Sequence, residues 1–157
     1  MANINSDLAT KQAASVRDRS AGIIDGDDAC GIVLYATAKV NIPAGVAVND
    51  TLTLVPTEAI PLGAVVIPQL SHVFFVTDPG TALTLDIGLT SSAKKFADGL
   101  VCNNIGIVNF AASATVPTGI ATPHRFTTQE AIRATVTTST SVVATTAIFT
   151  IAYRAKA

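Results

Sequence analysis

The feature of this sequence that most constrains its fold is an alternation of apolar and polar residues with a period of two. Residues 31–42 read GIVLYATAKVNI, and residues 51–55 repeat the alternation as TLTLV. Successive side chains of a β-strand point to opposite faces, so each segment offers one face to a core. Similar short segments follow at 63–68, 72–77, 81–89, 105–110, 131–138 and 146–154. We therefore predict about eight short strands.

The alternation also assigns each side chain to a face of its strand. Within 81–89, the leucine and isoleucine residues share one face, while Thr84, Asp86 and Gly88 share the other. The side chains expected to face a core are Ile32, Leu34, Ala36, Ala38, Val40, Ile42, Leu52, Leu54, Leu83, Leu85, Ile87, Leu89, Ile132, Ala134, Val136, Phe149, Ile151 and Tyr153.

Turn signals separate the predicted strands. They include Pro43 to Gly45, Asn49-Asp50 and Asp78 to Gly80, and STSVVA at 139–144 is predicted as a loop or hairpin turn. With no long helix expected, the pattern is typical of an all-β, antiparallel β-sandwich, and eight strands fit a jelly roll best. The polar connection 113–130 is expected to cross between the two sheets, as in Greek-key topologies.

The chain is expected to form one domain with an N-terminal extension. It has 157 residues, of which 49% are hydrophobic, enough for a single core without disulfide staples. Residues 1–28 are polar and weakly patterned, so we interpret them as an arm that is either disordered or docked on a neighbour. Residues 29–157 are predicted to form the jelly-roll domain.

Charge and hydropathy exclude some partners and favour others. The formal net charge is −1 and no cluster of basic residues occurs, so a nucleic acid is not expected as a partner. No apolar run approaches the roughly 18 residues of a membrane-spanning helix. Only 13% of residues are charged and the mean hydropathy is +0.49, which favours a surface partly buried in an assembly.

The N-terminus and the cysteines indicate the compartment of synthesis. The first 20 residues lack the basic start and apolar centre of a secretory signal, so synthesis in a cytosol is expected. Cys30 and Cys102 then read as reduced, small apolar residues, although the sequence leaves open whether they lie close enough to pair. Neither belongs to a CxxC motif, so metal binding and thiol catalysis have no support.

Catalytic and cofactor motifs give little support to an enzyme. No GxSxG elbow occurs, and a triad would have to combine Ser71 or Ser91 with His72 or His124 outside any motif. We expect His72 to be a packed strand residue and His124 to be a loop residue. No glycine-rich phosphate loop follows a strand, so no nucleotide cofactor is expected.

The segment IIDGDDACG contains the candidate metal ligands Asp25, Asp27 and Asp28. Alternate aspartates around a glycine resemble the start of a calcium loop. The ligand at the fifth position and the closing bidentate glutamate of an EF-hand are missing. A solvated turn before the first strand is therefore the favoured interpretation, and no metal is assigned.

A small charged cluster, SSAKKFADGL, follows the predicted strand at 81–89. Ser91 or Ser92 is expected to cap one helical turn that ends at Asp98-Gly99, and Phe96 is expected to anchor the loop on the sandwich. Lys94-Lys95, without a second acid or a histidine, forms no general acid/base pair. Packing and solvation account for the cluster.

Two stretches carry a family resemblance. They are TLDIGLTSSAKKFADGL at 84–100, an LxIG strand running into a polar loop with a buried aromatic, and FTTQEAIRATVTTSTSVVATTAIFTIAYR at 126–154, a closing pair of strands. Over about Gly31 to Arg154 the chain resembles small structural proteins of tailed-bacteriophage virions, of the head decoration or cement type. The resemblance contains no catalytic motif and transfers no functional residues.

This resemblance implies a non-enzymatic assembly protein with a jelly-roll or related sandwich fold. Such a protein is made in the host cytoplasm, is usually a homotrimer, and binds the outer capsid surface through the major capsid protein or other virion proteins. The near-neutral charge favours the outside of a shell over contact with the genome. The alternatives are a neck, tail or fibre component, and a receptor- or glycan-binding jelly roll, against which the lack of Trp and the 5% aromatic content count.

Overall fold

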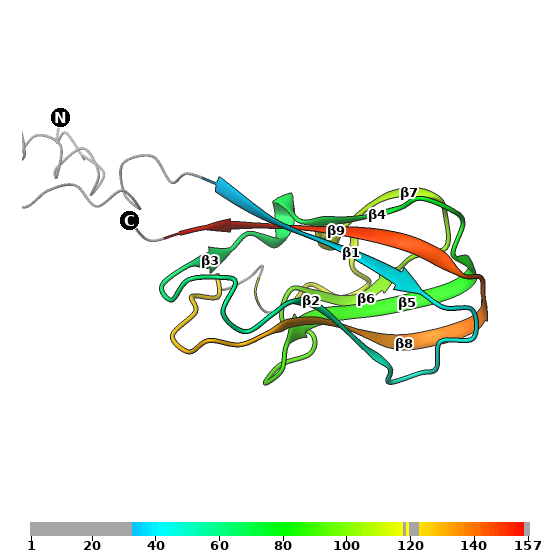
Figure 1. Ribbon diagram of the computed structural model, residues 1–157, viewed down its shortest axis with the longest axis horizontal. Coiled ribbons are helices and arrows are strands. Elements are labelled where there is room, and N and C mark those ends of the chain that lie inside the picture. The colour runs from blue at the N-terminus through cyan, green and yellow to red at the C-terminus, as the bar shows by residue number, and fades with distance from the viewer. Residues whose placement is uncertain (1–32, 118, 120–122, 156–157) are drawn as a thin grey trace, which may run out of the picture.

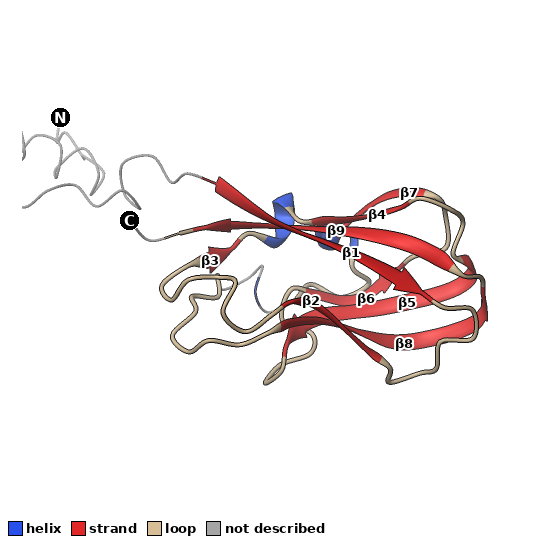
Figure 2. Cartoon of the chain, viewed as in Figure 1, coloured by secondary structure: helices blue, strands red, loops and turns tan. Residues whose placement is uncertain are grey.

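The computed structural model describes residues 33–117, 119 and 123–155, which form two facing β-sheets (Figures 1 and 2). Sheet A has the strand order β1-β9-β4-β7, and the short β3 also pairs with β9. Its strands are β1 (Val33–Ile42), β3 (Val65–Val66), β4 (His72–Phe75), β7 (Gly106–Asn109) and β9 (Thr145–Arg154).

Sheet B has the order β2-β8-β5-β6. Its strands are β2 (Thr51–Val55), β5 (Gly80–Leu89), β6 (Ala97–Val101) and β8 (Ile132–Val142), and the 3-10 helices η1 (Pro68–Leu70) and η2 (Phe110–Ala112) lie in the connections. All the pairings between these strands are antiparallel. Apart from β3, each sheet has four strands in the order of a jelly roll. The predicted antiparallel sandwich is confirmed.

The core lies between the two sheets, where the predicted apolar faces meet. Side chains from β5 and β8 that were assigned inward are almost fully buried, and so are Phe149 and Ile151 of β9. Ala36, Ala38, Val40, Leu52 and Tyr153 are partly buried against this core, and Ile32 lies outside the described residues. Leu34 is the one described residue of the predicted set that is exposed, with 40% of its surface accessible. It lies at the start of β1, which extends past the strands of the facing sheet (Figure 1), so no layer covers it.

One predicted element, the helical turn after β5, is wrong. The helical turn expected between Ser91 and Asp98 is absent; a short turn there leads into strand β6, which begins at Ala97. Gly99, read as a helix terminator, lies inside β6 with φ +68°, and the pairing of β5 with β6 shifts register between Leu85 and Ile87. The expected burial of Phe96, by contrast, is confirmed.

The turn between the last two strands is shorter than predicted. Residues 139–142 of the STSVVA segment continue β8, because they pair with the first half of β5, and β9 starts again at Thr145. Ser141 has φ +56°, which gives this end of β8 a local irregularity. The prediction that 113–130 crosses between sheets is confirmed, since it joins β7 of sheet A to β8 of sheet B. The predicted arm, residues 1–28, lies outside the described residues.

Candidate functional site

A polar cluster lies on the outer face of sheet B, between β5, β6 and the loop that joins them. Asp86 of β5 is 3% exposed, and its Oδ1 accepts a hydrogen bond of 2.8 Å from the backbone N–H of Gly99. The Nζ of Lys94 lies 2.9 Å from Oδ1 of Asp98 and 3.7 Å from Oδ2 of Asp86. The hydrogen bond to Asp98 and the charges of both carboxylates raise the pKa of Lys94.

The loop that carries Lys94 folds back over the sheet at Gly88. Leu89 and Ser92 exchange backbone hydrogen bonds of 2.8 and 3.1 Å, and the N–H of Phe96 donates to the carbonyl oxygen of Ile87 at 2.8 Å. A Cβ atom at Gly88 would collide with the backbone of Ser92 and Ala93. The side chain at this position must therefore be absent for the loop to lie so close to β5.

Glu130 ties the other side of this loop to the segment before β8. The backbone N–H of Ser91 donates to Oε2 of Glu130 at 3.0 Å, and the hydroxyl of Thr128 approaches Oε1 at 3.4 Å. Hydrogen bonds from Ser91 lower the pKa of Glu130. Lys94 and the acids Asp86, Asp98 and Glu130 are thus held in contacts that fix the position of the loop.

His124 is a loop residue, as expected, and its ring packs between two phenylalanines. The ring centroids lie 6.0 Å from Phe96 and 5.2 Å from Phe126, both in edge-to-face geometry. Burial lowers the pKa of His124, the nearby charge of Lys95 lowers it further, and Glu130 acts in the opposite direction. The imidazole therefore serves as part of an aromatic cluster that favours its neutral form.

We expect this cluster to lose stability as the pH falls below the ordinary histidine pKa of 6.5. Because the pKa of His124 is lowered in the folded protein, the unfolded chain takes up the proton first, so the contribution is complete above pH 6.5 and decreases below it. NMR titration of the imidazole should show a lowered pKa that rises in Lys95→Gln. In denaturant titrations His124→Asn should flatten the fall in stability between pH 7 and 5; an unchanged slope would contradict this role.

The residues considered for a triad do not come together. Ser71 is fully buried, donates from Oγ to the carbonyl oxygen of Ile67 at 2.9 Å and accepts from the N–H of Ala152 at 3.0 Å, so it joins η1 to β9. His72 follows it on β4 and its side chain points to the opposite face. No hydrogen bond links a serine hydroxyl to either histidine in the part of the chain that the structure describes.

Of the cysteines and of the candidate metal ligands, the structure describes Cys102 alone. Cys102 is buried and reduced, and burial raises its pKa to about 12, which makes the thiol inert. Cys30 and the metal candidates Asp25, Asp27 and Asp28 lie outside the described residues, so the reduced state of Cys30 and the solvated turn at the three aspartates stay predictions. Residues 33–117, 119 and 123–155 hold no group of three or more His, Cys, Asp or Glu side chains placed to bind a metal ion.

Two hollows open on the surface. One, of about 330 Å³, is lined by Asn41, Thr77 and Thr145 among others, and the hydroxyls of Thr77 and Thr145 lie 3.0 Å apart and bond to each other. The second, of about 210 Å³, lies beside β3 and η1. Neither is lined by an aromatic side chain, the platform on which sugar rings usually stack.

Several large apolar side chains of the described residues are exposed on the surface. They are Leu34, Tyr35, Val48, Leu62, Leu70, Phe74, Val76, Val101, Ile105, Ile107, Val116 and Val143. No helix among the described residues is long and apolar enough to cross a membrane. Among the exposed side chains, Phe74 and Ile107 lie opposite each other on neighbouring strands of sheet A, and apolar side chains that gather on one face in this way indicate contact with another protein surface.

Comparison with known proteins finds a similar fold in a chain of a phage capsid. No family model matches the sequence, and no curated protein matches it significantly. A chain of the capsid asymmetric unit of cyanophage Pam1 is 20% identical with a TM-score of 0.52, over 80% of this chain and 86% of that chain. The two chains share a fold. A chain of the acidic stable capsid structure of Helicobacter pylori bacteriophage KHP30 is 14% identical with a TM-score of 0.44, over 78% of this chain and 87% of that chain.

Proposed function

We propose that this chain is a non-enzymatic structural protein of a phage virion that decorates the outer capsid surface and reinforces it by bridging capsid subunits. The observation that carries the proposal is the fold shared with a chain of the cyanophage Pam1 capsid over most of both chains. Because one fold serves many functions, the proposal also needs support from the surface of this chain.

The charge of the chain supports a position on the outer side of a shell. It has 10 basic and 11 acidic residues, so it lacks the positive surface that contact with packaged DNA requires. The exposed apolar side chains support protein partners, which we propose to be the major capsid protein or other virion proteins. A homotrimer made in the host cytoplasm is the expected building unit.

The described polar groups support a structural role over a catalytic one. Asp86, Lys94 and Asp98 hold a loop, Ser71 joins η1 to β9, and His124 packs between aromatic rings. These groups are engaged in contacts that maintain the sandwich. The proposal therefore includes no reaction and no cofactor.

The proposal is tested by adding the purified protein to capsid shells of its phage from which accessory proteins have been removed. We expect saturable co-sedimentation and regularly repeated density on the outer surface in electron cryomicroscopy images. Binding confined to one vertex would instead indicate a neck or tail component, and no binding to shells would reject the proposal. Native mass from light scattering tests the trimer separately.

A deletion variant tests the predicted arm. Deletion of residues 1–20 should weaken binding to the shells several-fold while leaving the thermal unfolding of the sandwich unchanged, because a tethered arm adds affinity through effective concentration. Equal binding by the deleted and full-length proteins would show that the arm has no docking role.

A further inference from the structure

A sandwich of two open sheets has four edge strands, and in the described residues three of them are obstructed. On β1 the exposed Lys39 interrupts the edge, and β2 carries a register shift between Thr53 and Val55. The edge of β6 is covered, since Ala114 and Thr115 donate backbone hydrogen bonds to it. Charges, bulges and covering segments are the usual protections of an edge against pairing with another chain.

The fourth edge, β7, has none of these protections. Its sequence GIVN contains no charge and no proline, and it pairs with β4 in unbroken register. The N–H of Phe110 donates to Ser71, so alternation turns the backbone groups of Val108 toward β4 and those of Ile107 away from the sheet. The N–H and C=O of Ile107 and the N–H of Asn109 thus line an edge that no described residue covers.

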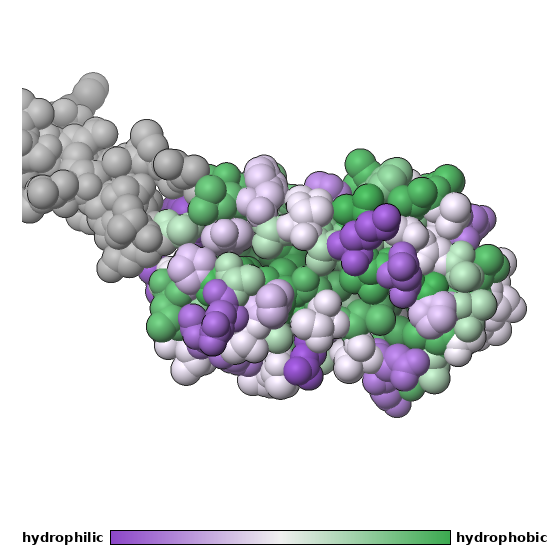
Figure 3. Space-filling view, in the orientation of Figure 1, coloured by the Kyte–Doolittle hydropathy of each residue, from purple (hydrophilic) through white to green (hydrophobic). Residues whose placement is uncertain are grey.

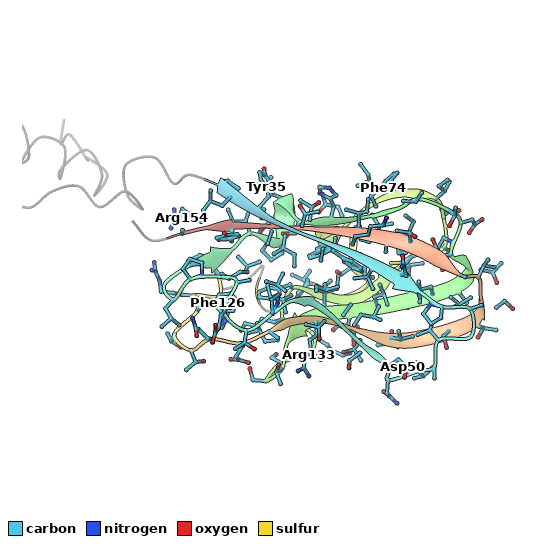
Figure 4. The ribbon with its side chains drawn as sticks, in the orientation of Figure 1. Tyr35, Asp50, Phe74, Phe126, Arg133 and Arg154 are labelled. Carbon is cyan, nitrogen blue, oxygen red and sulfur yellow. The ribbon has the colours of Figure 1, made fainter. Side chains whose placement is uncertain are left out.

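An apolar row on the outer face of sheet A runs up to this edge. Register places Ile107 opposite Phe74, and Phe74 opposite Ile148 of β9. Ile107 is 69% exposed and Phe74 is 37% exposed. Figure 3 shows apolar surface over β4 and β7, and Figure 4 shows Phe74 on the outer side of the sheet. An open edge and an apolar face meet at Ile107.

We propose that β7 pairs antiparallel with β7 of a second copy of this chain, about a twofold axis at Ile107. The N–H of Ile107 in each copy would donate to the carbonyl oxygen of Ile107 in the other, which forms a hydrogen-bonded pair that twofold symmetry allows. The two A sheets become continuous across the contact. The Ile107 side chains of the two copies become neighbours on the outer face and bury the apolar surface that each turns toward the edge, and the apolar row formed by Ile148, Phe74 and Ile107 continues into its own copy.

The charge of the surface favours a second copy over other occupants. The strand and the row contain no ionisable side chain, so two copies meet without like-charge repulsion and without burying a charge. The segment 1–32, by contrast, has eight charged residues, so it matches this uncharged surface less well than a second copy does. The contact deepens the proposed assembly role and rests on it, since it links copies, or trimers, to one another.

A disulfide tests the contact directly on the full chain. In a Cys30→Ser background, Ile107→Cys should form a covalent dimer under mild oxidation, because paired Cα atoms in an antiparallel ladder lie about 5.5 Å apart, within disulfide range. Cys102 does not interfere, since it is buried. Val143→Cys is the matched control, because Val143 is also exposed but lies in the β8–β9 turn. Equal dimer yields from the two variants, or none from Ile107→Cys, would overturn the proposal.

Native mass provides a second test that does not depend on capsids. Ile107→Lys should halve the mass of the isolated protein in light scattering, whereas Val143→Lys should leave it unchanged. An unchanged mass for Ile107→Lys overturns the contact even if the protein binds shells. If Ile107→Lys weakens shell binding without affecting self-association, a strand of the capsid occupies the edge instead. Failure of shell binding with intact self-association would reject the proposed function alone.

Discussion

Phe75→Ala should lower the free energy of unfolding by about 3–5 kcal/mol, whereas Phe74→Ala should lower it by less than about 1 kcal/mol. The two phenylalanines are neighbours on β4, so their backbones and sequence contexts are nearly the same. Phe75 is fully buried between the sheets, and its truncation leaves a cavity. Phe74 points to the outer face, where a smaller side chain leaves no cavity.

Urea unfolding at a fixed protein concentration measures the difference, and the Ile107→Lys background removes any contribution from self-association. Similar losses of stability from both variants would contradict the assignment of these residues to opposite faces of sheet A.

Gly88→Ala should destabilise the protein by about 2–3 kcal/mol although it adds a single methyl group. The new Cβ would overlap the backbone of Ser92 and Ala93, and a backbone cannot move aside as a flexible side chain can. The loop must therefore lift from β5, which separates Lys94 from Asp86 and exposes that carboxylate. Most of the cost comes from displaced backbone, because an ion pair with an exposed lysine contributes little.

The matched control is Gly45→Ala. Gly45 has φ +75°, and no atom lies within 4 Å of the position that a Cβ atom would occupy, so alanine there meets backbone strain of about 1 kcal/mol without a collision. Hydrogen exchange should show faster exchange of the Leu89 and Phe96 amides in Gly88→Ala alone. Equal destabilisation by the two substitutions, with unchanged exchange, would show that the loop does not depend on Gly88.

Strands with one apolar face could be predicted from sequence, and strands maintained mainly by their neighbours could not. TLTLV alternates cleanly, and β2 has the predicted bounds. In ADGLV, Asp98-Gly99 has the composition of a turn, yet β5 supplies a hydrogen-bonding edge and Gly99 accommodates the irregular register. Tertiary pairing overrides local preference there, as it does where the start of β5 extends β8 through Ser141.

The polar cluster and the open edge show two further limits of sequence reasoning. Alternation correctly placed Asp86 opposite the leucines of its strand, but its burial depends on a loop that folds back over that face. Ile107 was part of a predicted strand, but whether a strand lies at an edge depends on the order of strands in the sheet. That order is a property of the whole chain, so the candidate interaction surface could not be predicted from the segment itself.

The places of β8 and β9 in the two sheets also affect when the protein can fold during synthesis. β8 lies between β2 and β5, and β9 lies between β1 and β4, so each holds together strands made much earlier. Neither sheet can be completed until residues 132–154 have left the ribosome. Until then the nascent chain exposes several unpaired apolar strands, and we expect slow folding, sensitivity to truncation within β9, and dependence on chaperones at high expression.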